Sequence, residues 1–153
     1  MIPEAIRRNI AKLDTPDWNV NEEVWPAMKS LDVSVVPYLL EAYPTFRHWQ
    51  GRVCLVHHAA RFSRRSEDAF QLGMAAASDR SKRVRYSACL LLAYSLNPQA
   101  LDVLRPLLSY SDRETVENAR AAINSIERQN HHLFKDRSGR GVRLILNPED
   151  RLG

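Results

Sequence analysis

A pair of helical segments recurs along the chain every 31 residues, and this repeat constrains the fold more than any other feature. Apolar positions of the first helix superimpose: Ala69, Phe70, Leu72 and Ala76 match Ala100, Leu101, Val103 and Leu107. In the second helix two sets fall in register: Val53, Val84 and Thr115, and Ala60, Leu91 and Ala122. One hairpin of this size has too little surface to form a core alone, so consecutive hairpins must bury their apolar faces on one another.

Helix-start signals separate these segments. Ser66 precedes two acids, Asn97 precedes Pro98, and the run SDRE from Ser111 to Glu114 has the form of a capping box. The apolar spacing between such signals predicts helices near residues 3–13, 22–31, 34–46, 49–63, 66–78, 81–95, 98–109 and 113–129.

The length and composition fit one all-α domain. The chain has 153 residues, of which 44% are hydrophobic and 26% charged, enough to bury a core. We expect residues 1–33 to form an N-terminal helical cap, residues 34–129 three hairpin repeats, and residues 130–153 a C-terminal hairpin and tail. No run reaches the ~18 apolar residues of a membrane helix. Cys54 and Cys89 are too few for a disulfide framework, which favours a cytoplasmic setting.

The middle hairpin carries the most regular motif. Its run DRSKRVRYSACLLL, from Asp79 to Leu92, has an Asp–x–Ser–x–x–Val–Arg–x–x–Ala pattern that resembles the HEAT repeat, over roughly residues 34–128. The resemblance implies a HEAT-like α-α solenoid, a right-handed stack of helical hairpins. It also implies that Asp79 lies in the turn between the two helices, A and B, of a hairpin, and that Arg85 ties that turn down. The outer units depart from this pattern, with Thr115-Val116 and Val53-Cys54 in place of Val-Arg.

A helical wheel of the middle B helix identifies the surface available for binding. Val84, Ala88, Leu91 and Leu92 cluster on one face, which we assign to the core. The opposite face and its counterparts 31 residues away would line the concave side that B helices form in HEAT-like stacks. Aromatic and Arg side chains there are typical of a protein interface, and the alternative is that an N-terminal helix, a tail or a dimer partner covers them. The partner-binding candidates are Leu55, His58, Phe62, Tyr86, Cys89, Glu117, Arg120 and Asn124.

The net charge of +4 is concentrated in residues 51–85, which hold 8 basic and 3 acidic side chains. One basic group, Arg61, Arg64 and Arg65, ends a B helix. A second group, Arg80, Lys82 and Arg83, follows about 20 Å away at the far end of the next A helix. Since they are expected at opposite rims, they make no continuous phosphate track, which makes nucleic acid an unfavoured partner.

No catalytic or metal-binding pattern emerges. The adjacent pairs His57-His58 and His131-His132 lack the three- or four-residue spacing with which a helix holds a metal. The run SGRG has neither the context nor the Lys-Ser/Thr ending of a phosphate loop, and Ser138 has no recognisable base. We therefore expect no enzyme activity, no cofactor and no metal.

The C-terminal residues predict a β-hairpin. HHLFKDR and VRLILNP (Val142–Pro148) would run extended around the Gly139 and Gly141 turn, with Leu133, Leu144 and Leu146 covering the last helix pair. Three basic residues of this segment, Lys135, Arg137 and Arg140, are further partner-binding candidates.

The run IERQNHHLFKDRSGRG, with NPED after it, resembles a C-terminal signature of small bacterial HEAT-repeat proteins. Some proteins with this signature are immunity proteins that neutralise a cognate secreted or polymorphic toxin. The resemblance implies a non-catalytic protein-binding module of this kind. The alternatives are an adaptor or scaffold HEAT protein, a nucleic-acid-binding or lesion-processing HEAT-like protein and, third, an enzyme that resembles the phycobilin lyases built on HEAT repeats.

Overall fold

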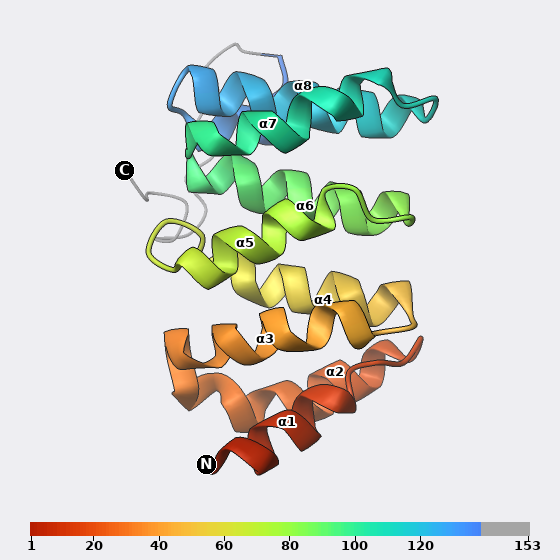
Figure 1. The fold of residues 1–153 in the computed structure, drawn as a ribbon, viewed down its shortest axis with the longest axis vertical. Coiled ribbons are helices and arrows are strands. Elements are labelled where there is room, and N and C mark those ends of the chain that lie inside the picture. Colours follow the sequence, from red (N-terminus) through yellow and green to blue (C-terminus); the bar gives the residue numbers. More distant parts are fainter. Residues whose placement is uncertain (139–153) are drawn as a thin grey trace.

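The computed structural model describes residues 1–138, and within that range every regular element is helical (Figure 1). The α-helices are α1 (Pro3–Ala11), α2 (Trp18–Val24), α3 (Val36–Ala42), α4 (Trp49–Ala60), α5 (Glu67–Ala76), α6 (Lys82–Ser95), α7 (Leu101–Leu104) and α8 (Arg113–Glu127). Shorter 3-10 segments are η1 (Trp25–Val35), η2 (Tyr43–Thr45), η3 (Pro98–Ala100), η4 (Arg105–Ser109) and η5 (His131–Phe134). The all-α prediction is therefore confirmed for this part of the chain.

The helices stack in two layers along the long axis of the molecule. In Figure 1, α1, α3, α5 and α7 lie in front, and α2, α4, α6 and α8 lie behind them. Within the rear layer α4 packs on α6 and α6 on α8, while α3–α4, α5–α6 and α7–α8 pack across the layers. Each helix therefore buries its apolar stripe on the next helix in the chain and on the next helix of its own layer.

The sequence signals locate most helix ends correctly. Ser66 caps α5 by accepting from the Ala69 N–H, and Asn97 caps η3 by accepting from the Gln99 N–H. The cap of α8 is Asp112, one residue beyond the predicted Ser111, and its carboxylate accepts from the backbone and the hydroxyl of Thr115. Asp112 rather than Ser111 caps the helix because its carboxylate accepts two hydrogen bonds at once near the positive end of the helix dipole.

A ladder of Arg–Asp contacts joins consecutive hairpins. Arg52 of α4 is 4% exposed and forms a two-pronged ion pair with Asp79, with Nε–Oδ2 at 2.8 Å and Nη2–Oδ1 at 3.1 Å. Arg85 of α6 makes a looser counterpart of this pair: its Nη2 lies 3.6 Å from Asp112 Oδ2, and its Nε donates to the Thr115 hydroxyl at 3.0 Å. As expected, Arg85 also ties its own turn by donating to the Asp79 carbonyl at 2.8 Å.

The positions of the Arg–Asp contacts show that the first two hairpins are 33 residues apart, not 31 as the sequence predicts. The helices α4, α6 and α8 begin at Trp49, Lys82 and Arg113, at intervals of 33 and then 31 residues. Arg52 is therefore the counterpart of Arg85 in the first hairpin, and the predicted alignment of Val53 with Val84 is wrong by two positions. The shift changes which side chains of α4 face outward.

Close helix packing at Gly73 fixes the distance between α5 and α6. A Cβ atom built on Gly73 would lie 2.4 Å from Cδ2 of Leu91, far inside van der Waals contact. Leu91 itself is fully buried, as the helical wheel predicts. Glycine at this position lets the two helix backbones approach closely.

The first strand of the predicted C-terminal hairpin is not present. Residues 131–134 form η5 instead, capped by the Asn130 side chain, which accepts from the His132 N–H at 3.1 Å. Leu133 and Phe134 are buried against the rear helices, because a helical turn directs both toward α8 and α6. The second predicted strand, with Leu144 and Leu146, lies outside the described residues.

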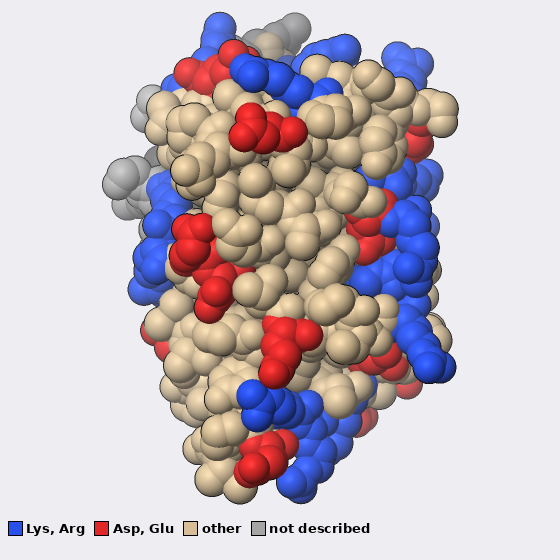
Figure 2. All heavy atoms as spheres, viewed as in Figure 1, with Lys and Arg blue, Asp and Glu red and all other residues tan. Residues whose placement is uncertain are grey.

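Basic side chains gather along the two edges of the stack, where the turns between helices lie (Figure 2). Figure 1 places the turns before and after α5 at opposite edges, so the two basic groups of the sequence are separated as predicted. Among residues 1–138, no helix combines the length and the apolar composition that crossing a lipid bilayer requires.

Candidate functional site

Three of the predicted binding residues are buried, so their predicted exposure is wrong. Leu55 and Cys89 are 0% exposed and Phe62 is 2% exposed. The 33-residue interval explains Leu55 and Phe62: Val53, not Leu55, is the counterpart of Tyr86, and Phe62, just after α4, corresponds to the buried Ser95. Other parts of the chain cover part of this face, while Tyr86, Glu117 and Arg120 stay exposed on it.

The N-terminal residues cover one end of that face. The ring of His58 stacks on Trp25, with centroids 3.5 Å apart and an interplanar angle of 6°, and His58 Nε2 lies 3.1 Å from Asn21 Oδ1. Phe62 lies next to the same Trp25 and to Met28 at a hollow of about 400 Å³. His58 is therefore a packing residue rather than a free surface histidine.

The segment 131–138 covers the other end. Arg64 anchors it: Nε donates to the Tyr94 carbonyl at 2.6 Å, and Nη2 lies 2.8 Å from His131 Nδ1. Because a guanidinium can only donate, that His131 nitrogen accepts. Phe134 is fully buried and contacts the Tyr86 ring, with centroids 5.7 Å apart. Arg64 thus has a structural role that its predicted place on the rim does not suggest.

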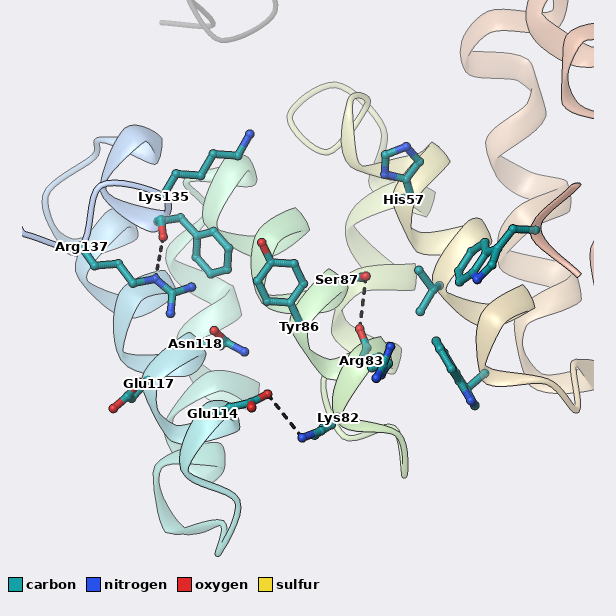
Figure 3. A pocket seen from close by; sticks show the side chains of 14 residues that line it. His57, Lys82, Arg83, Tyr86, Ser87, Glu114, Glu117, Asn118, Lys135 and Arg137 are labelled. Carbon is teal, nitrogen blue, oxygen red and sulfur yellow. Dashed lines mark hydrogen bonds and ion pairs between the residues drawn. The ribbon is translucent and has the colours of Figure 1, made fainter. Parts of the chain in front are cut away.

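An open groove remains between these two covers, on the rear layer. It measures about 930 Å³, and Figure 3 shows the side chains that line it. One row, contributed by α4, α6 and α8 in turn, consists of Val53, Tyr86 and Glu117. The other lining residues are Trp18, Trp49, His57, Lys82, Arg83, Ser87, Glu114, Asn118, Phe134, Lys135 and Arg137.

Aromatic rings and guanidinium groups alternate along the groove. Trp18 and Trp49 meet edge to face, with centroids 6.1 Å apart, and Arg83 lies 4.9 Å over the Trp49 ring. At the opposite end Arg137 lies 4.8 Å over Phe134, and its Nε donates to the Phe134 carbonyl. Trp18 is 47% exposed and Tyr86 41%. Exposed aromatic side chains held next to arginine are the composition of binding hot spots.

The structure brings together some predicted residues and separates others. Tyr86, Glu117, Lys135 and Arg137 share the groove. Arg120 and Asn124 lie on the adjacent part of α8, at a second hollow of about 560 Å³ that Glu117 and Arg137 also border. Arg140 lies outside the described residues.

Sequence reasoning missed several groove residues: Trp18, Trp49, Val53, His57, Arg83 and Phe134. Val53 follows from the 33-residue interval, whose signal is the common spacing of Arg52 to Asp79 and Arg85 to Asp112. Nothing in the sequence alone places Trp18 or Phe134 beside it, because both come from segments outside the repeat.

Cys54 and Cys89 are buried free thiols. Burial raises the pKa of the Cys54 thiol to about 11 and that of Cys89 to about 12, so both thiols are protonated at neutral pH. The described residues contain no group of three or more His, Cys, Asp or Glu side chains placed to hold a metal ion.

Acidification should weaken the N-terminal cover through His58. Burial, with the positive charges of His57 and Arg61, lowers the pKa of His58 from 6.5 to about 3. Between about pH 6.5 and pH 3, His58 is therefore protonated in the unfolded chain and neutral in the folded chain. The free energy of unfolding falls as the pH drops through this range.

We expect wild type to lose more stability between about pH 7 and pH 5 than His58→Gln does. Urea denaturation of both proteins at several pH values measures the two slopes. Equal slopes would contradict the assignment of His58 as a half-buried, neutral side chain.

Comparison with known proteins identifies no family: no protein-family model matches this chain, and no curated protein matches its sequence.

Proposed function

We propose that this protein is a non-catalytic protein-binding module of the HEAT-like solenoid class, and that it acts as an immunity protein against a bacterial toxin. The observation that carries the binding role is the open groove, in which Trp18 and Tyr86 stay exposed beside arginine side chains. A solvated surface would favour Lys and Glu over exposed aromatic rings.

The HEAT-like assignment rests on the two-layer stack and on the Arg–Asp ladder between hairpins. Arg52 and Arg85 each pair with the Asp 27 residues later in the chain, so that one contact repeats from unit to unit. The immunity role rests on the C-terminal signature, whose residues His131 to Arg137 supply a wall of the groove. A toxin is neutralised by occlusion alone, for which an interface of about 1,600 Å² with a few buried anchors suffices.

Tyr86→Ala tests this function. We expect the variant to bind the partner about 1–4 kcal/mol more weakly and to keep nearly the wild-type melting temperature, since Tyr86 is exposed and central in the groove. The partner is first identified by co-purification from the source cell and mass spectrometry, and its affinity is then measured by calorimetry. If the partner is a toxin, protection in a co-expression assay should fall with the affinity.

Leu108→Ala provides a matched control. Leu108 is an exposed apolar residue on η4 and lies outside the groove, so its replacement should leave affinity and protection unchanged. Full binding by a stable Tyr86→Ala variant would contradict a role for the groove. A partner that is not a toxin would instead point to an adaptor.

A further inference from the structure

The carboxylates of the groove are already neutralised by neighbouring cations. Glu114 lies 3.5 Å from Lys82, and Glu117 lies 3.1 Å from Arg113, one helical turn earlier on α8. These four side chains therefore contribute little net charge to the groove. The charge offered to a ligand comes from the other cations along its length.

Two of those cations are Arg83 and Arg137. Both are exposed, and within residues 1–138 neither forms an ion pair with a carboxylate. Each guanidinium instead stacks on an aromatic ring, Arg83 on Trp49 and Arg137 on Phe134. Stacking restricts the rotamers of a long side chain while leaving N–H groups at the plane edge to bind a carboxylate in two-pronged fashion.

An apolar floor separates the two guanidinium groups. Tyr86 projects from α6 into the middle of the groove, with Arg137 on one side and Arg83 on the other (Figure 3). Val53 lines the same groove on α4. The order along the groove is thus cation, apolar surface, cation.

On this basis, and resting on the proposed protein-binding function, we propose that the groove receives an acidic segment of the partner protein. An apolar side chain of that segment packs on Tyr86, and flanking carboxylates pair with Arg83 and Arg137. A nucleic-acid strand fits less well, because its regularly spaced phosphates need a continuous row of cations, whereas Tyr86 separates Arg83 from Arg137 in this groove (Figure 3). A peptide, by contrast, can carry carboxylates only at the positions that face Arg83 and Arg137.

Selection from a library of random displayed peptides tests the proposal with the full-length protein as bait. We expect the selected peptides to carry Asp or Glu on both sides of an aromatic or aliphatic residue. A synthetic copy of a selected peptide should bind about tenfold more weakly to the double variant Arg83→Gln/Arg137→Gln, and also at high salt. Its Gln/Asn analogue should lose affinity for wild type to a similar degree.

Arg105→Gln is the control, because Arg105 is an exposed arginine on η4 that does not line the groove. Neutral or basic selected sequences, no enrichment, or a peptide indifferent to the double variant would overturn the proposal. So would tighter binding of a single-stranded oligonucleotide than of the peptide. If the natural partner responds to Tyr86→Ala but not to the double variant, the proposed function stands and only the acidic-segment inference fails.

Discussion

Replacing Asp79 by Ala should lower the free energy of unfolding by about 3–5 kcal/mol, because it leaves a buried guanidinium without its counter-charge. Arg52 and Asp79 both have side chains only 5% exposed. The carboxylate also accepts from the Tyr43 hydroxyl at 2.5 Å and from the Ser81 N–H at 2.8 Å. Burial alone would raise the pKa of Asp79, but the bonds from Arg52 and Tyr43 outweigh it and hold that pKa below its ordinary value.

Urea denaturation of Asp79→Ala and of Glu41→Ala measures this effect against a matched control. Glu41 pairs with Arg7 at 2.9 Å, but both side chains are 54% exposed, so breaking this solvent-screened pair should cost far less stability than breaking the buried one. Replacing both Arg52 and Asp79 by apolar residues should recover much of the loss. Comparable losses for Asp79→Ala and Glu41→Ala would show that the Arg52–Asp79 pair is not desolvated.

Phe62→Ala should lower stability by a similar amount, about 3–5 kcal/mol, because the side chain is almost completely buried. Its ring packs where the end of α4 meets η1, and Arg61 and Arg65 lie over it at 5.0 and 5.1 Å. The truncation would leave a cavity next to Trp25 and Met28 that the surrounding backbone cannot close.

Comparison of Phe62→Ala with Tyr86→Ala tests which of the two residues lies on the binding surface. Phe62→Ala should lower the melting temperature and leave the affinity of the folded fraction unchanged. Tyr86→Ala should weaken partner binding and leave the melting temperature nearly unchanged. Thermal denaturation and calorimetry on both variants separate the two effects. A stable Phe62→Ala protein with weakened binding would mean that Phe62 reaches the partner.

The helices and most of their caps follow from the sequence because their causes are local. Apolar spacing and side chains such as Ser66 and Asn97 act within a few residues, and they set where each helix begins. Leu91 is assigned correctly to the core for the same reason.

The candidate binding surface could not be predicted in the same way. It depends on the alignment of one hairpin with the next and on which segments from outside the repeat cover the rear helices. The first hairpin has Gly51-Arg52 where the middle one has Val84-Arg85, and the glycine hides the motif from a search for Val-Arg. A Cβ at Gly51 would lie 2.7 Å from the Leu13 carbonyl oxygen, so the N-terminal segment excludes valine there. A wheel also cannot tell that residues from outside the repeat cover His58 and Phe62.

The wall that η5 contributes to the groove has a consequence for biosynthesis. Each hairpin docks mainly on the one before it, so the stack can assemble in order as the chain leaves the ribosome. The contact of Arg64 with His131, however, can form only after a further 67 residues have been synthesised. The contact of the Tyr86 ring with Phe134 likewise needs the C-terminal segment. Nascent chains therefore pass through a stage in which the stack is folded but the groove lacks one side. If the groove binds a partner as proposed, only a chain synthesised through Arg137 presents the complete binding surface.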